Sequence, residues 1–262
     1  MLDSKNKVLT FISFIGLLFL ILPLIMVVIS SFNIESTISI QITGISFQWY
    51  KNIFQQPDFI EGFKSSALVA IISSMIALVI GIPAVYALSQ NGVHHKKWFH
   101  SLFLSPALIP EIVIGFSLYQ LAVIDLRMPV FPSLIIGHFL LCIPYVIRLV
   151  SASMLMMDHH IEEAAWISGC SPTKSFFFVV LPNIKTSIIA AFMMCFINSF
   201  NNLPISLFIS GSSFIMLPPA ILNYLQNNYD PTVSAISVLL MLLTAIMMLI
   251  IDKTIGIEKI TN

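Results

Sequence analysis

Long apolar segments separated by short polar ones run through this chain of 262 residues. A helix that crosses a membrane needs about 20 mostly apolar residues, and six segments reach that length. Their approximate bounds are 8–31, 65–90, 99–124, 133–155, 183–210 and 232–251. The pattern therefore predicts an all-α membrane protein with six spans in a single transmembrane domain, residues 1–262.

Composition indicates the same class of protein. The chain is 58% hydrophobic and 9% charged, with a mean hydropathy of +0.97, whereas a soluble domain is about 25% charged. We therefore expect lipid around the spans. A net charge of zero argues against nucleic acid as a partner. The first apolar run is too long for a secretory signal and no small-x-small cleavage site follows it, so we expect an uncleaved span.

Lysine and arginine predict the orientation, because they gather on the cytoplasmic side of membrane proteins. With a cytoplasmic N-terminus, nine of the twelve lie inside or at the inner boundary. These are Lys5, Lys7, Lys96, Lys97, Arg148, Lys174, Lys185, Lys253 and Lys259, against Lys51, Lys64 and Arg127 outside. Both termini and the polar segment 156–182 are therefore predicted to lie in the cytoplasm.

Five prolines fall inside the apolar segments: Pro83, Pro106, Pro110, Pro144 and Pro204. Each lacks a backbone donor and tends to kink its helix, and neighbouring helices in a bundle can satisfy the freed carbonyls. Two interpretations stay open. Either the kinks are ordinary features of bundle packing, or those near 106–110 and at 204 shape a pathway through the membrane.

The polar segment between the fourth and fifth apolar segments predicts two short helices. The first, Asp158–Ser168, begins with a residue that can cap its free N–H groups, and Gly169 suits the left-handed position after it. The second, Pro172–Val180, follows a capping serine, has proline at its first position and carries three phenylalanines that should lie along the membrane surface.

The same segment carries a spaced motif. Glu163, Ala164 and Ala165 are followed after three residues by Gly169 and, after nine more, by Val179-Val180-Leu181-Pro182. This spacing resembles the EAA loop of ABC-importer permeases, whose pattern is E-A-A, three residues, G, nine residues, an aliphatic residue, any residue and L-P. The resemblance implies that Glu163, Ala164, Ala165, Gly169, Leu181 and Pro182 couple the chain to an ATPase. The alternative is a solvated connector helix, because E-A-A alone is common in helices.

Further stretches resemble the same family. Gly81–Leu88 is similar to its G-x-P-x-x-Y-A-L segment, Ser105–Val113 to S-P-x-x-x-P-E/D-I-V, and Phe47–Phe54 to F-x-W-Y-x-x-x-F. The resemblance is nearest to the permeases of polyamine importers, of the spermidine/putrescine permease C type. It implies the six-span type I (MetI-like) permease fold, with the coupling helix between the fourth and fifth spans, and a polyamine-type cargo. Aminoethylphosphonate, thiamine and iron(III) are the alternative cargoes.

The resemblance also implies partners. A second permease, usually of a different sequence, would complete the pathway, ATPase subunits would lie beneath it, and an extracytoplasmic solute-binding protein would deliver the solute to a bacterial inner membrane. The chain contains no G-x-x-x-x-G-K-[ST] loop, so another protein must supply the ATPase. We expect this subunit to be no enzyme and to hold no cofactor.

No metal site is expected either. His94-His95 and His159-His160 are adjacent pairs, and adjacent residues on a helix do not face one another. The three cysteines make no disulfide framework or C-x-x-C pair, and Cys142 and Cys195 lie in apolar runs, where a small buried side chain is expected.

Four polar residues within the apolar segments are candidates for the transport pathway. Glu111 lies near the middle of a segment, where a carboxylate is costly unless it has a function or a partner. It either meets a cationic solute or braces a kinked helix after Pro110. Asn198, Asn201 and Asn202 either line the pathway or bond to a neighbouring helix. The polyamine permeases that the chain resembles carry acidic residues where Asn201 and Asn202 stand, which weakens the case for a polycation.

Two other classes of protein compete with a permease. An intramembrane enzyme would need a nucleophile–base pair or metal ligands within the membrane, and the spans supply Glu111 and His138 but no G-x-S-x-G motif or His-rich set. We expect His138 to be hydrogen-bonded within the bundle. An ion-coupled secondary transporter usually shows internal repeats and several charges near the midplane. Neither feature occurs here, and both classes leave the spaced motif unexplained.

Overall fold

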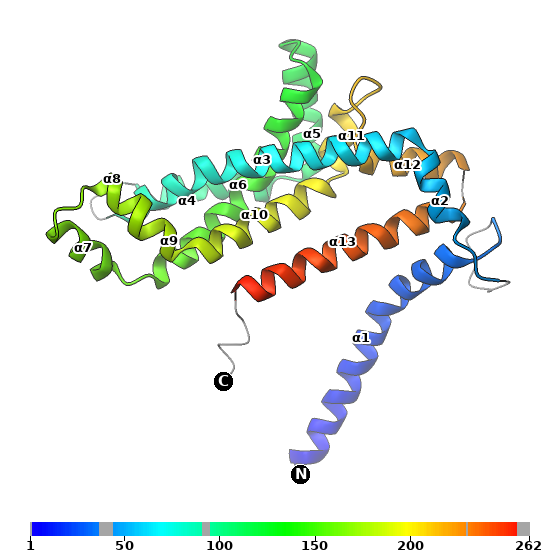
Figure 1. Ribbon diagram of the computed structural model, residues 1–262, viewed down its shortest axis with the longest axis horizontal. Helices are drawn as coiled ribbons and strands as arrows, with labels where there is room; N and C mark the ends of the chain where they lie inside the picture. Colours follow the sequence, from blue (N-terminus) through cyan, green and yellow to red (C-terminus); the bar gives the residue numbers. More distant parts are fainter. Residues whose placement is uncertain (1, 37–43, 91–94, 229, 256–262) are drawn as a thin grey trace. The chain divides into compact units, whose positions relative to one another are not determined.

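The computed structural model describes residues 2–36, 44–90, 95–228 and 230–255, and in these ranges the chain is helical apart from connecting segments and two isolated β-bridges. Its first elements are α1 (Leu2–Phe32), α2 (Gln48–Gln55), α3 (Pro57–Ser89), α4 (Lys96–Leu104), the 3₁₀ turn η1 (Ser105–Leu108), α5 (Glu111–Leu118), the π-helical turn η2 (Tyr119–Asp125) and α6 (Val130–Met156) (Figure 1). Then follow α7 (His159–Ile167), α8 (Pro172–Ser175), the π-helical turn η3 (Phe176–Val180), α9 (Leu181–Asn183), α10 (Lys185–Phe200), α11 (Pro204–Ile209), α12 (Leu217–Asn228) and α13 (Thr232–Ile255).

Four helices of the described chain, α1, α3, α6 and α13, are long and apolar enough to cross a membrane. Two further pairs of helical segments pass the same test together but are bent. Lys96–Leu108 and Glu111–Asp125 meet at 92°, and Pro172–Asn183 and Lys185–Phe200 meet at 72°. The count is therefore four spans, or six where each bent pair crosses as one. The all-α membrane class is confirmed.

The third expected span, 99–124, is not one continuous helix. Ile109 and Pro110 adopt extended backbone, with ψ near 130° at both residues, and α5 begins anew at Glu111. A residue that precedes proline is disfavoured in the helical region, so the helix ends before Pro110. This break produces the 92° bend.

The fifth expected span, 183–210, is also divided. It bends at Ile184, and α10 ends at Phe200. Asn201–Leu203 then separate it from α11, which starts at Pro204. Proline has no N–H to donate into the preceding turn, which suits the first position of a helix, whereas Pro83 and Pro144 lie within the continuous helices α3 and α6.

Two compact units make up the chain. One comprises residues 1–60 and 220–245, and the other comprises residues 61–219 and 246–262. Within the first unit, the Trp49 indole donates to the carbonyl of Asn33 (2.6 Å), which holds α2 against the end of α1. The single transmembrane domain expected from the sequence stays a prediction.

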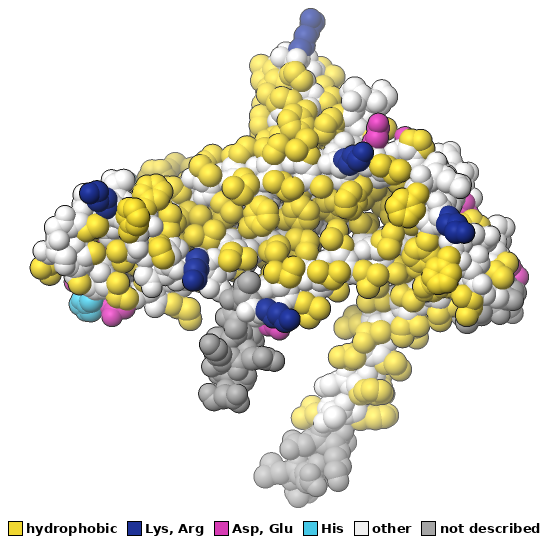
Figure 2. Space-filling view, in the orientation of Figure 1, with side chains coloured by type: hydrophobic (Ala, Val, Ile, Leu, Met, Phe, Trp, Pro, Cys, Tyr) yellow, Lys and Arg dark blue, Asp and Glu magenta, His cyan; other side chains and the backbone are white. Residues whose placement is uncertain are grey.

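From Leu9 onward, helix α1 of the first unit is apolar and exposed on every side over most of its length. The consecutive residues Phe19 and Leu20 point in different directions, and they are 77% and 74% exposed. A helix that is hydrophobic all round is typical of a membrane span. Figure 2 shows hydrophobic side chains covering the visible face of α3 in the same way.

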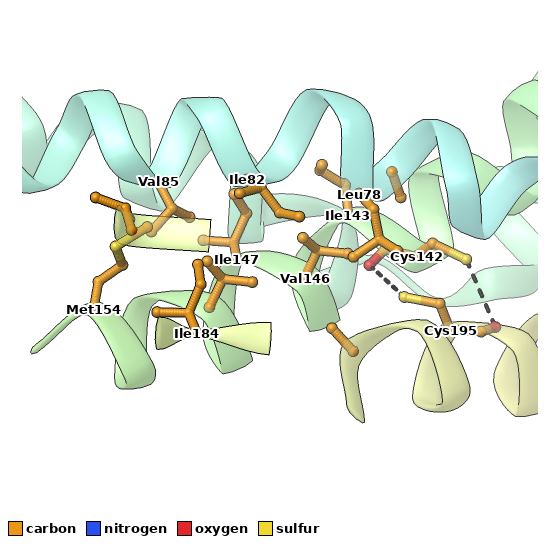
Figure 3. Packing of buried hydrophobic residues seen from close by; sticks show 14 residues of the cluster. Leu78, Ile82, Val85, Cys142, Ile143, Val146, Ile147, Met154, Ile184 and Cys195 are labelled. Atoms are coloured by element: carbon orange, nitrogen blue, oxygen red, sulfur yellow. Dashed lines mark hydrogen bonds between the residues drawn. The ribbon is translucent and has the colours of Figure 1, made fainter. Parts of the chain in front are cut away.

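The core of the second unit lies between α3, α6 and α10 (Figure 3). Leu78 and Ile82 of α3 meet Val146 and Ile147 of α6 there. Cys142 and Cys195 are fully buried, and each thiol donates to the other's carbonyl, at 3.7 and 3.3 Å. They are small interior residues, as expected.

Polar clamps join the same helices. His138 of α6 is fully buried, with Nδ1 2.7 Å from the Ser199 hydroxyl and Nε2 3.3 Å from that of Ser206. The expectation that His138 is hydrogen-bonded within the bundle is confirmed. Because both ring nitrogens have partners, this side chain ties α6 to α10 and to α11.

Candidate functional site

Helix α7 and the turn after it have the local geometry that the sequence predicts. Asp158 Oδ1 accepts a hydrogen bond from the N–H of His160 (3.0 Å) and so caps the helix. Gly169 has φ +88°, and the N–H groups of Gly169 and Cys170 bond back to Trp166 and Ala165. This pair of bonds is the Schellman motif, which satisfies carbonyls at a helix end and requires a left-handed residue.

The second predicted helix, Pro172–Val180, is also present, as α8 and η3. Ser171 caps it through the N–H of Lys174 (3.4 Å). Its last five residues widen into a π-helical turn. Phe177 and Phe178 are 56% and 77% exposed, which leaves them free to lie in a membrane surface.

Glu162 holds this site together through contacts that the sequence did not predict. It is buried, 3% exposed, and accepts hydrogen bonds from the Tyr86 hydroxyl (2.5 Å), the Ser175 hydroxyl (3.3 Å) and the Gln90 amide (3.5 Å). A buried carboxylate needs such donors. It therefore joins α7 to α8 and to the end of α3. Tyr86 belongs to the Gly81–Leu88 stretch, so two separate motifs meet at this side chain.

Glu163, the first residue of the spaced motif, is exposed. Its side chain is 58% accessible and lies 3.0 Å from Nδ1 of His160, which is 85% accessible. The hydrogen bond to Glu163 raises the pKa of His160, and the charge of Asp158 adds to the effect. Figure 2 shows histidine and acidic side chains side by side at the α7 end.

The remaining motif residues divide between the surface and the core. Ala164 is exposed and Ala165 half-buried, and Ile167 beside them is 88% exposed. Leu181 packs against the core of the second unit, whereas Pro182 is exposed. Helix α7 thus presents a small, partly apolar surface, while the end of the motif anchors the loop to the bundle.

Two of the four pathway candidates lie together. The Asn202 amide donates to Oε2 of Glu111 (2.7 Å), across the two broken helices. Asn202 is 4% exposed, and its own oxygen accepts from the N–H of Ile205 (3.0 Å), in the first turn of α11. Glu111 stands at the first position of α5 and is half-buried.

The other two candidates lie on α10 and at its end. The Asn198 amide donates to the Tyr145 hydroxyl of α6 (2.7 Å), which is a bond between neighbouring helices. Asn201 is exposed and bonds to the carbonyl of Ile197 one turn back. These contacts bring Glu111 and Asn202 together and leave Asn198 and Asn201 with other partners.

No group of three or more His, Cys, Asp or Glu side chains in the described ranges is arranged to hold a metal ion. Among the residues weighed from the sequence, His94 and Lys259 lie outside the described ranges.

A protein-family model described as "Binding-protein-dependent transport system inner membrane component" matches residues 65–253. That range includes α7, the turn at Gly169 and both broken helices. The chain belongs to this family. It is a permease subunit of an ABC importer, and the family is one of transport proteins of the inner membrane.

Individual relatives agree. The permease is 27% identical over 234 residues to the putrescine transport system permease protein PotI of Escherichia coli K12. The aligned region covers 87% of this chain and 83% of that relative. It is 25% identical over 231 residues to the spermidine/putrescine transport system permease protein PotC of Haemophilus influenzae, with 88% and 90% coverage.

A solved structure shows the same fold. A chain of a bacterial ABC transporter involved in the import of the acidic polysaccharide alginate superposes with a TM-score of 0.74. The match covers 96% of both chains at 16% identity. This likeness confirms the type I permease fold that the motifs imply.

Proposed function

We propose that this permease forms one half of the pathway of an ATP-driven importer for a polyamine-type solute. The relatives named as putrescine and spermidine/putrescine permeases support this cargo. The permease itself carries out no covalent chemistry. Its helices alternate between outward and inward access as a separate ATPase opens and closes.

The observation that carries the proposal is the carboxylate of Glu111 at a broken helix. Discontinuous helices, whose breaks leave backbone N–H and C=O groups without helical partners, line the solute sites of many transporters. Oε2 is held by Asn202, and Oε1 receives no hydrogen bond from the described residues. One carboxylate oxygen is therefore left for a cationic group, and ammonium is the cation that polyamines carry.

The neutral side chain of Asn202 has a consistent role in this arrangement. Its amide holds the Glu111 carboxylate, and its oxygen holds the start of α11. Asn202 therefore positions the acid and adds no charge of its own. The second ammonium group of a diamine would need an acid from the partner permease. Cargoes with one cationic group, such as aminoethylphosphonate or thiamine, are the competing candidates.

Coupling to the ATPase takes place at α7 in this proposal. Ala164 and Ile167 offer a small apolar surface that fits a groove, and Glu163 offers a charge for a basic residue there. Glu162 holds α7 against α3 and α8. Movement of the ATPase would therefore reach the membrane helices through a rigid contact. In this arrangement α7 and both termini face the cytoplasm.

The remaining partners are proposed from the family. A second permease, of a different sequence, faces Glu111 across the pathway. An extracytoplasmic binding protein brings the solute to the opposite membrane face. The family description names dependence on such a protein.

Uptake of labelled putrescine by cells that carry the complete importer tests the cargo. We expect Glu111→Gln to reduce uptake at least tenfold at limiting putrescine and Asp252→Asn, an exposed acid in α13, to leave it unchanged. Equal uptake by Glu111→Gln and wild type would refute the pathway role. Uptake of thiamine or aminoethylphosphonate with no uptake of putrescine would refute the cargo.

Purification of the tagged permease from gently solubilised membranes tests the coupling. We expect an ATPase subunit to copurify with wild type and with His160→Gln, and to be lost with Ile167→Asp and with the double variant Glu163→Ala/Gly169→Pro. His160 is the matched control because it is exposed on the same helix. If Ile167→Asp retains the ATPase as well as the control does, α7 is not the docking helix.

A further inference from the structure

A cavity of about 580 Å³ lies within the second unit. Its walls come from the end of α3, the start of α4 and the end of α6. Small-molecule sites in proteins commonly have volumes of about 300–1,000 Å³. The cavity is therefore large enough to receive a molecular group and not only solvent.

The position of the cavity places it at a membrane–water boundary. Helices α3 and α6 are both long enough to cross the membrane, and they end at Ser89 and Met156. The cavity is lined by residues from the last turns of each. A cavity at the ends of two spans opens where lipid headgroups lie.

The lining combines positive charge with an apolar wall. Lys96, Lys97 and His100 of α4 lie on one side, and Leu88 and Met154 lie on another. None of the ten lining residues is acidic, and the described residues give neither lysine an ion pair. Two uncompensated ammonium groups therefore face one concave site.

The backbone adds to this potential. Helix α4 begins at Lys96, and the residue before it, His95, gives the helix no side-chain cap. The free N–H groups and the dipole of a helix start favour an anion. The lysine side chains and the helix start thus attract the same kind of ligand.

We propose that this cavity binds the phosphate of an anionic glycerophospholipid, with its acyl chain along Leu88 and Met154. Basic pockets between membrane helices are suited to anionic headgroups. The apolar wall favours a lipid over a soluble phosphate, because a soluble anion gains nothing from it. The site requires that the chain is inserted in a membrane, but it does not require a particular transported solute. The lipid proposal can therefore be tested independently of the polyamine proposal.

Native mass spectrometry of the complete permease, released from nanodiscs of equal phosphatidylglycerol and phosphatidylcholine, tests the site. We expect wild type to retain phosphatidylglycerol preferentially. If each lysine that faces the bound headgroup strengthens anionic binding about fivefold, Lys96→Gln/Lys97→Gln should weaken retention roughly 30-fold. The matched control is Lys185→Gln/Lys253→Gln, which removes two exposed lysines outside the cavity and should keep the preference.

A second variant separates the cavity from general surface charge. Ser101 is an exposed lining residue, and Ser101→Trp should fill the space and lower retention while both lysines remain. Equal loss in the two lysine pairs, or full retention by Ser101→Trp, would overturn the proposal. Competition by millimolar glycerol phosphate as strong as that by the lipid would overturn the lipid assignment in favour of a soluble phosphate. Occupation of the cavity by a protein, seen as crosslinks from Lys97 to another subunit without retained lipid, would also overturn it.

Discussion

At the scale of single residues, the adjacent glutamates Glu162 and Glu163 of α7 have opposite environments. Glu162 is turned inward and accepts hydrogen bonds from Tyr86, Gln90 and Ser175, whereas Glu163 is turned to solvent and, among the described residues, pairs with His160. A buried hydrogen bond to a charged group contributes more than an exposed ion pair. Glu162 therefore stabilises the loop, and Glu163 is free to meet a partner.

Removal of the Tyr86 hydroxyl should destabilise the loop. Tyr86→Phe deletes one of the donors to the buried Glu162, and hydrogen bonds to charged groups contribute about 1.5–3 kcal/mol. We expect a lower thermal midpoint in detergent. Tyr119→Phe is the matched control, because the described residues give that hydroxyl no partner. Equal midpoints for the two variants would contradict the role of the Tyr86–Glu162 bond.

The exposed pair should show a pH dependence of definite sign. Glu163 raises the pKa of His160, so the pair stabilises α7 fully below about pH 6.5, the ordinary histidine value. The contribution is lost as the pH rises through the raised value. Glu163→Gln should lower the pKa of His160, measured by NMR titration of labelled histidine and assigned with His160→Gln. An unchanged pKa would show that the pair does not form in solution.

At the scale of elements, two helix breaks determine how the segments of the second unit pack. Because of the break at Pro110, α5 begins at Glu111, and because of the break before Pro204, α11 begins at that residue. The two starts then pack closely. A Cβ added at Gly115 of α5 would lie 3.0 Å from the Ile205 Cα and 3.0 Å from the Pro204 carbonyl oxygen. Small residues permit this backbone approach.

A methyl group at this contact should separate α5 from α11. Gly115→Ala forces backbone to move, and overpacking of this kind costs about 1–3 kcal/mol. We expect a lower thermal midpoint and weaker solute uptake, since Glu111 and Asn202 lie on the same two breaks. Gly16→Ala in α1 is the control, because nothing lies within 4 Å of its added Cβ. Unchanged stability for Gly115→Ala would show that the two helices tolerate a wider separation.

At the scale of the whole molecule, the bent pairs decide the topology. If each pair crosses the membrane, α7 and the α3–α4 connection lie on the same side. If each pair turns back, they lie on opposite sides. The first arrangement agrees with the lysine and arginine distribution and with docking of an ATPase at α7.

The native cysteines allow a direct test. Cys142 and Cys195 are buried, whereas Cys170 beside α7 is partly exposed. An impermeant maleimide should label Cys170 in inside-out vesicles and not in intact cells. A cysteine placed at Ser101 in a Cys170→Ser background should behave in the same way. Opposite labelling of the two positions would mean that the pairs turn back and that four spans cross.

Local features could be predicted from the sequence. The apolar lengths of α1, α3, α6 and α13, the cap at Asp158 and the turn at Gly169 all depend on residues close together in the chain. Hydrophobic periodicity, the length of an apolar segment and helix capping each depend on residues that are near one another in the chain. They can therefore be recognised in a single sequence. The family resemblance rests on the same short motifs and is confirmed.

Contacts between distant residues required the tertiary structure. Tyr86 and Glu162 are 76 residues apart, and Glu111 and Asn202 are 91 apart. The proline pattern indicated kinks, but not that the 99–124 segment bends by 92°. The sequence determined the four long apolar helices and the caps and turn around α7, because these depend on local backbone and side-chain chemistry. Only the packed structure decided which carboxylate is buried and which polar groups meet, because those depend on how helices far apart in the chain pack together.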